Sequence, residues 1–249
     1  MIPDRRLGFI SSVQLMAERV ESFERYPFSL AAVAALHKPL TLDPRVTFLV
    51  GENGAGKSTL IEAIAVASGF NAEGGSKNFN FATRASESEL HRCVRLVRGW
   101  NRPRTGFFLR AESFFNVATA IEGLGVGYAY GDKSLHEQSH GESFLALIMH
   151  RFGPQGLYIL DEPESALSTR RQLALLARMH ELVNAGSQFI IATHSPILTA
   201  FPKALIYELS SNGIQRLAYE ETDQFQLTKR FLEDPNTFLE MLFAEAPKR

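Results

Sequence analysis

The residues with the clearest chemistry in this chain lie between positions 51 and 58, in the run Gly-Glu-Asn-Gly-Ala-Gly-Lys-Ser. This run matches the pattern G-x-x-x-x-G-K-[ST] at every defined position. Its glycines allow the backbone to turn sharply, so that successive N–H groups point inward and surround an anion. The lysine adds a positive charge and the serine adds a hydroxyl that can bind a metal ion. The run therefore predicts a site for the phosphates of a nucleotide, with Mg²⁺ beside them.

The flanking sequence supports this prediction. A buried strand over 46–50 precedes the run and a helix over 59–65 follows it, so that the positive end of the helix dipole faces the phosphates. We expect Lys57 to contact the β- and γ-phosphates and Ser58 to ligate Mg²⁺. In this part of the chain, the residues predicted to contact the nucleotide are Glu52, Asn53, Gly54, Ala55, Gly56, Lys57, Ser58 and Thr59.

A pair of acidic residues, Asp161 and Glu162, follows the apolar run 157–160 about a hundred positions later. In a nucleotide hydrolase, the first carboxylate at such a strand end holds Mg²⁺ and the second orients and deprotonates the attacking water. The guanine-reading pattern N-K-x-D is absent from the sequence, which favours ATP over GTP. These residues together predict the hydrolysis of ATP to ADP and phosphate.

Apolar runs alternate with helical patterns along the chain, which favours an α/β fold with a mostly parallel sheet covered by helices. Asn212-Gly213 between two apolar runs predicts a β-hairpin. Gly186 is expected to end a long helix. The predicted strands are 46–50, 93–98, 106–110, 157–160, 188–192, 205–209 and 214–218, and those at 93–98 and 106–110 form a meander around a turn at 101–104. The predicted helices are 59–65, 113–122, 141–151, 168–185 and a tail from 224 that breaks near Pro235. The predicted loops are 71–83 and 123–138.

Composition limits the class of protein. The chain has 249 residues, 45% of them hydrophobic and 21% charged, which is typical of a globular protein. Its net charge of −1 gives no overall attraction to nucleic acid or to membranes. The single cysteine, Cys93, excludes an internal disulfide and fits a reducing compartment. No apolar run is long enough to span a membrane and no signal-peptide pattern opens the sequence. We therefore expect a cytoplasmic protein that is not inserted in a membrane.

These motifs and their order resemble the ATP-binding-cassette (ABC) ATPases, and within them the soluble branch that includes RecF-type and SMC-type proteins. The resemblance covers about residues 9–219 of a single domain, 1–249, in which 220–249 is a helical tail. It implies a P-loop NTPase fold with a mostly parallel core sheet, an antiparallel β subdomain and a short helical signature lobe.

The resemblance extends to three further segments. Residues 139–143 are similar to the signature motif and keep its serine, Ser139, and its central glycine, Gly141. Residues 165–168 resemble the D-loop, and His194 resembles the switch histidine near the γ-phosphate. In this family the signature of one subunit caps the ATP that the P-loop of another subunit holds. The resemblance therefore implies a homodimer that forms when ATP binds.

Two positions are less clear. The family stacks an aromatic ring on adenine, and either Tyr26 or Phe28 could provide it here, or both could be core residues. The family has a glutamine that contacts Mg²⁺ after the strand 106–110, where this chain has Glu112. A carboxylate can also ligate the metal, so Glu112 is a candidate ligand that departs from the family pattern.

Two other patterns have competing interpretations. Residues 136–140 match H-E-x-x-H, a zinc-protease pattern, but the segment follows a glycine-rich loop and overlaps the signature, which disfavours zinc. Seven arginines lie between 84 and 110. They could contact DNA phosphates, or they could form the solvated face of the strand meander, with a few of the arginines meeting acidic neighbours. Trp100 beside them could stack on a base or pack against the protein.

Three roles compete at the level of the cell. The first is a RecF/SMC-like ATPase in DNA maintenance or defence, with an unknown protein partner. The second is the ATPase subunit of an ABC transporter, against which the short segment between Glu112 and Ser139 counts. The third is a nucleotide-gated switch that controls a partner protein, against which the intact Glu162 and His194 count.

Overall fold

The computed structural model describes residues 8–76, 88–114, 119 and 140–244. The predicted helix 113–122 and loop 123–138, and part of the predicted loop 71–83, therefore fall largely outside the described residues. Among the described residues, no helix combines the length and apolar character needed to cross a membrane.

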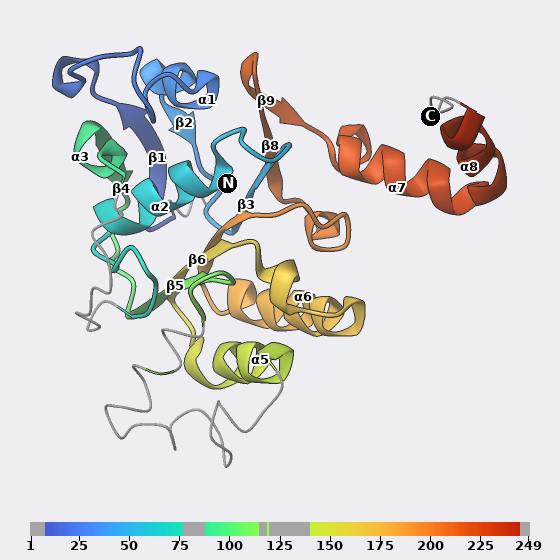
Figure 1. The fold of residues 1–249 in the computed structure, drawn as a ribbon. Coiled ribbons are helices and arrows are strands. Elements are labelled where there is room, and N and C mark those ends of the chain that lie inside the picture. Colours follow the sequence, from blue (N-terminus) through green and yellow to red (C-terminus); the bar gives the residue numbers. More distant parts are fainter. Residues whose placement is uncertain (1–7, 77–87, 115–118, 120–139, 245–249) are drawn as a thin grey trace, which may run out of the picture.

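The core is a six-stranded sheet in the order β5-β6-β7-β3-β8-β9 (Figure 1). Neighbouring strands from β5 to β8 are parallel, and β9 closes the sheet as the antiparallel arm of a hairpin with β8. The expected mostly parallel sheet and the hairpin at Asn212-Gly213 are both confirmed. The strands are β3 (Val46–Val50), β5 (Thr105–Arg110), β6 (Gly156–Asp161), β7 (Gln188–Ala192), β8 (Leu205–Ser210) and β9 (Gly213–Leu217).

Strands β3, β6 and β7 are buried along their whole length because helices or a second sheet cover both faces. One face packs against α5 (His140–Arg151) and α6 (Thr169–Asn184). Buried Leu175, Met179 and Leu182 lie on the inner face of α6, as their helical spacing predicts, and Gly186 follows its end with φ of 85°.

The other face of the core sheet packs against α2 (Lys57–Ala67) and a small antiparallel sheet. That sheet has the order β2-β1-β4, with β1 (Ile10–Leu15), β2 (Leu40–Thr41) and β4 (Val94–Arg98). It confirms the expected antiparallel subdomain. The remaining short elements are α1 (Ala31–Ala34), α3 (Leu90–Cys93) and the 3-10 turns Ala17–Arg19, Ala35–His37, Pro163–Ala166, Leu198–Ala200 and Tyr219–Glu221.

The predicted meander of β4 and β5 is wrong, because the two strands belong to different sheets. Residues 106–109 of β5 are all buried, so β5 needs cover on both faces and pairs in parallel with β6. Strand β4 exposes most of its residues and pairs with β1 instead. A sequence turn between two strands does not by itself make them partners.

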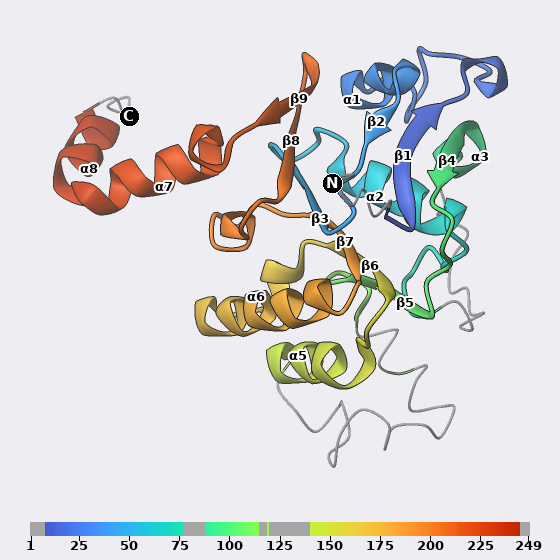
Figure 2. The same cartoon turned by 180° about the vertical axis from the view of Figure 1, so that it is seen from behind.

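The C-terminal tail forms α7 (Asp223–Glu233) and α8 (Pro235–Ala244), so the predicted break near Pro235 is confirmed. Both views show this helical pair reaching away from the two sheets (Figures 1 and 2). The edge of Phe231 packs on Phe238 across the break, with ring centroids 5.7 Å apart.

Candidate nucleotide site

The predicted site residues meet at the carboxyl edge of the parallel core sheet. The glycine-rich run follows β3, Glu112 follows β5, Asp161 ends β6 and His194 follows β7. These strands are parallel neighbours, so their carboxyl ends face the same side of the sheet. Ligands of open parallel sheets bind at this edge.

The glycine-rich run adopts the sharp turn that its sequence predicts. Gly51, Gly54 and Gly56 have φ angles of 134°, 81° and 94°, a region that residues with a Cβ rarely adopt. At Gly51 a Cβ would also overlap the carbonyl oxygen of Leu209. The two conditions together explain why a side chain is excluded at this position.

Lys57 is the first residue of α2 and is only 3% exposed. Its Nζ donates hydrogen bonds to the carbonyl oxygens of Gly51, at 2.9 Å, and Glu52, at 2.8 Å. Burial lowers the pKa of the Lys57 ammonium, an effect that the nearby carboxylates of Glu162 and Asp161 oppose. The lysine is thus held inside the turn, facing the two acidic residues at the end of β6.

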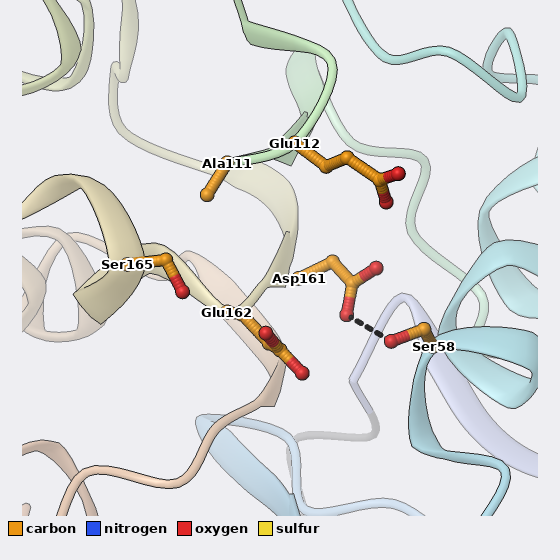
Figure 3. A pocket seen from close by; sticks show the side chains of 6 residues that line it. All are labelled: Ser58, Ala111, Glu112, Asp161, Glu162 and Ser165. Atoms are coloured by element: carbon orange, nitrogen blue, oxygen red, sulfur yellow. Dashed lines mark hydrogen bonds between the residues drawn. The ribbon is translucent and has the colours of Figure 1, made fainter. Parts of the chain in front are cut away.

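Asp161 and Ser58 join the two motifs directly. The Ser58 hydroxyl donates to Oδ1 of Asp161 at 3.0 Å, although the residues lie 103 positions apart (Figure 3). Burial raises the pKa of the Asp161 carboxyl to about 6, against the effects of Arg110 and of this hydrogen bond. A buried carboxylate beside a hydroxyl is a suitable pair of oxygen ligands for Mg²⁺.

A pocket of about 330 Å³ opens above this pair. It is lined by Ser58, Ala111, Glu112, Asp161, Glu162 and Ser165, and Figure 3 shows the three carboxylates arranged around it. The side chain of Glu112 is 90% exposed, so it lies at the rim. The described residues contain no group of three or more histidine, cysteine or acidic side chains placed to hold a metal ion. This donor set fits Mg²⁺, which binds through one or two carboxylates plus phosphate and water oxygens.

Glu162 occupies an unusual backbone conformation, with φ of 49° and ψ of 52°. A glutamate in the left-handed region stores strain of a kind that clusters at functional sites. The backbone N–H of Glu162 donates to Ala192 at the end of β7, which holds the turn. Nε2 of His194 lies 3.5 Å from Oε1 of Glu162. The predicted catalytic pair is therefore brought together.

The structure adds residues that the sequence analysis did not identify. The Arg110 guanidinium lies behind Asp161, with Nε 3.4 Å from Oδ2, and its Nη1 donates to Oε2 of Glu62 at 2.7 Å. Arg110 is therefore one of the arginines that meet acidic neighbours, and its side chain is largely buried instead of lying on a solvated face. Buried Gln172 accepts a hydrogen bond from the Ser195 hydroxyl at 2.6 Å and donates to the Leu167 carbonyl at 3.0 Å. No local pattern marks these residues, because Arg110 and Glu62 lie 48 positions apart and Gln172 and Ser195 lie 23 positions apart.

The two aromatic candidates separate clearly. Phe28 is buried in the core, so it is not free to stack on a base. Tyr26 is 67% exposed, and its hydroxyl lies 3.0 Å from Oγ1 of Thr59 at the start of α2. Tyr26 is therefore the aromatic residue that borders the glycine-rich run.

The signature segment is described from residue 140 onward, so Ser139 and the H-E-x-x-H histidine at 136 lie outside the described residues. Gly141 lies in the first turn of α5 and is buried. A Cβ on it would contact the Ala166 carbonyl at 2.6 Å and the Arg171 guanidinium at 2.8 Å. Arg171 also pairs with Glu142 at 2.9 Å. Residues of the same chain thus cover Gly141.

Two family models match parts of the chain. One, described as "AAA domain", matches residues 30–107. The other, described as "AAA domain, putative AbiEii toxin, Type IV TA system", matches residues 134–200. The first match contains the glycine-rich run, and the second contains the signature segment, the acidic pair and the segment of His194.

Curated relatives carry transporter names. The chain is 29% identical over 174 residues to the "ABC transporter G family member STR2" of Medicago truncatula, which covers 61% of this chain and 24% of that protein. It is 26% identical over 185 residues to the "Manganese transport system ATP-binding protein MntA" of Synechocystis sp., which covers 67% of this chain and 71% of that protein. The chain thus spans about a quarter of the first relative and most of the second.

Among solved structures, the chain is similar to cbiO1 from Clostridium perfringens, described as part of the ABC transporter complex cbiONQ. The TM-score is 0.50 at 16% sequence identity, and the match covers 94% of this chain and 99% of that chain. At this identity the similarity concerns the fold.

Proposed function

We propose that this chain, whose fold is similar to that of an ABC transporter ATPase and which two AAA-domain models match in part, binds Mg-ATP and hydrolyses it to ADP and phosphate. The observation that carries the proposal is the hydrogen bond from Ser58 to Asp161. It joins the phosphate-binding turn to the acidic strand end, where Glu162 lines the same pocket and lies near enough to Lys57 for its charge to act on the lysine. We further propose that the whole chain acts as one nucleotide-binding domain.

In the proposed binding step, the phosphates occupy the turn formed by residues 51–58. Phosphate oxygens replace the carbonyl oxygens of Gly51 and Glu52 as acceptors for Lys57. Tyr26 stacks on the adenine. Ser58 and Asp161 would hold Mg²⁺, with Glu112 at the rim of the same pocket. The metal would supply stabilisation of the negative charge on the phosphates.

In the proposed chemical step, Glu162 accepts a proton from the water that attacks the γ-phosphate. Its left-handed backbone aims the carboxylate into the pocket beside Asp161. His194, 3.5 Å from the Glu162 carboxylate, orients that group and faces the γ-phosphate. Its own loop is held by hydrogen bonds of Ser195 to Gln172 and of the His194 backbone N–H to Glu164.

We also propose that two copies of the chain form a head-to-tail dimer around two nucleotides, with Ser139 and Gly141 of one copy capping the ATP of the other. In the single chain Gly141 lies under Ala166 and Arg171. Closure therefore requires these two residues to shift when the partner arrives. The Arg171 side chain can move away at a small cost in free energy, because its ion pair with Glu142 is partly exposed to solvent.

The dimer has a direct test. Glu162→Gln keeps the shape of the side chain and removes the base, so the variant is expected to accumulate as an ATP-bound dimer in light scattering with saturating Mg-ATP. Glu181→Gln, on the exposed side of α6, is the matched control and stays monomeric under these conditions. If Glu162→Gln binds ATP and remains a monomer, the dimer proposal is wrong.

For the cellular role, we propose an ATPase that acts on DNA in maintenance or defence. Three arginines at the amino edge of the sheet support this role, since two of them, Arg102 and Arg104, make no ion pair within the described residues. A second candidate is the ATPase subunit of a transporter, which the transporter names of the curated relatives favour. Phosphate release measured with and without DNA separates the two, because only the first predicts stimulation. A nucleotide-gated switch would bind ATP without turnover.

A further inference from the structure

A second hollow lies at the amino edge of the core sheet, opposite the nucleotide pocket. Strands β3, β5, β6 and β7 run parallel and all begin at this edge, and the segments that lead into them line a groove of about 1230 Å³. This volume exceeds the roughly 300–1,000 Å³ typical of a small-molecule site. We call it the amino-edge groove; the residues that matter here are Arg45, Trp100, Asn101, Arg102, Arg104 and Gln155.

The charge of the amino-edge groove is one-sided. Of the described residues, three arginines line it and no acidic residue does. Within the part of the chain that the structure describes, the exposed side chains of Arg102 and Arg104 make no ion pair. Arg45 is paired with Asp43 at 3.3 Å and donates to the Lys203 carbonyl at 2.9 Å, which holds it in place. The groove therefore presents two unpaired guanidinium groups, those of Arg102 and Arg104, beside a third arginine, Arg45, whose side chain is held in place.

Trp100 lies beside these arginines and is 93% exposed. The alternative in which it packs against the protein is therefore wrong. A fully exposed indole costs solvation free energy unless a ligand covers it, and its flat face suits the face of a nucleobase. The amide side chains of Asn101 and Gln155, in the same groove, offer both donors and acceptors to base edges.

The groove is held open by its backbone. Arg104 donates its N–H to the Gln155 carbonyl at 3.0 Å, which ties the arginine segment to the start of β6. Gly99 donates to the Phe9 carbonyl at 3.1 Å, which anchors the other end of the segment. Buried Gln188 bonds to the carbonyl oxygens of Ile10 and Asp43 below it. The surface is thus formed before any ligand binds.

We propose that the amino-edge groove binds single-stranded nucleic acid. Arg102 and Arg104 contact the phosphates, Trp100 stacks on an unpaired base, and the amides contact base edges. In a duplex the base faces are hidden in the stack, so Trp100 would have no partner. An acidic peptide would satisfy the arginines and leave the indole uncovered. This site deepens the nucleic-acid role proposed above and is separate from the nucleotide pocket, with which it shares no residue.

The experiment uses Trp100 as its own probe, because the chain has a single tryptophan. Titration of the full chain with an oligothymidylate of about 20 nucleotides at about 50 mM salt is expected to quench its fluorescence. In anisotropy with a labelled strand, Trp100→Ala is expected to weaken binding about tenfold or more, and Trp100→Phe to retain most of it. The logarithm of the binding constant falls linearly with the logarithm of the salt concentration. Replacing both Arg102 and Arg104 with alanine should make this slope less steep by about 1.4.

Controls separate this site from the ATPase. Arg230→Ala, exposed on α7, is expected to bind the strand like the unaltered chain. Lys57→Ala should lose ATP binding and keep strand binding, so that failure of one proposal is distinguishable from failure of the other. The groove proposal is overturned by an absence of quenching at low salt, by unchanged binding of the Trp100 and arginine variants, by preference for a duplex, or by equal competition from polyglutamate.

Discussion

Replacing Arg110 with methionine removes the cation that two buried carboxylates share. The guanidinium of Arg110 donates to Glu62 at 2.7 Å and lies 3.4 Å from Asp161. All three side chains are largely buried, and methionine fills a similar volume without the charge. Glu62 belongs to α2 and Asp161 to β6, so the change leaves two carboxylates from different elements without their common partner.

The expected cost follows from this geometry. Removal of one member of a buried ion pair costs about 3–5 kcal/mol, because the charge left behind is uncompensated. Protonation limits the cost: without Arg110 the pKa of Asp161, which burial already raises to about 6, rises further. We therefore expect a loss of about 3 kcal/mol at pH 7.5. The loss should be smaller at pH 5.5, where the Asp161 carboxyl takes up a proton more readily in the variant.

The assay is urea unfolding of the metal-free chain at these two pH values, with Arg95→Met as the control. Arg95 lies on the exposed face of β4, and its guanidinium donates to the side chain of Gln14 at 2.8 Å. Its replacement should change the free energy of unfolding by about 0.5 kcal/mol or less. If Arg110→Met is as stable as Arg95→Met at pH 7.5, the guanidinium does not hold the two carboxylates and the reasoning is refuted.

Two further predictions concern the same pocket. A carboxyl whose pKa is raised by folding binds its proton more tightly in the native state, so Asp161 stabilises the fold below about pH 3.8 and loses this contribution as the pH rises through about 6. Urea titrations of the metal-free proteins measure the difference in unfolding free energy between the unaltered chain and Asp161→Asn. This difference should fall by roughly 3 kcal/mol at most from acid to neutral pH. Unfolding free energies of the two proteins that change in parallel with pH would contradict this. In calorimetry, Tyr26→Ala should weaken ATP binding about tenfold and Tyr26→Phe should preserve it, because stacking needs the ring and not the hydrogen bond to Thr59. Equal affinities of the two variants for ATP would show that Tyr26 does not stack on the adenine.

Much of the fold could be predicted from the sequence because the signals are local. The turn at 51–58 depends on glycines at positions with positive φ, and these positions appear in the sequence itself. Strand β7 and helix α6 were predicted within one residue of their bounds, because a buried apolar run and a helical period each leave a clear pattern. Ser58 and Asp161 were each assigned to Mg²⁺ from their own motifs, and their side chains lie 3.0 Å apart in the structure.

Other features depend on contacts between distant segments and could not be predicted. The sequence does not show which of the seven arginines meets an acidic neighbour, since Glu62, the partner of Arg110, lies 48 positions away on another element. Phe28 and Tyr26 are two residues apart, yet one is buried and the other exposed. The partner of β4 was also misassigned, because strand pairing depends on which faces are covered and not on the turn between strands.

One measurement tests the roles assigned to Ser58, Asp161 and Glu162 together. It is the rate of phosphate release at saturating Mg-ATP by the unaltered chain and by Glu162→Gln, with ATP binding measured on the same samples. Loss of a general base slows a reaction about 10²- to 10⁴-fold. We expect steady turnover by the unaltered chain, and a decrease of at least about a hundredfold in the variant with ATP binding retained. Equal rates for the two proteins, or no turnover by the unaltered chain while it binds ATP, would contradict the assignment of this pocket as a site of ATP hydrolysis.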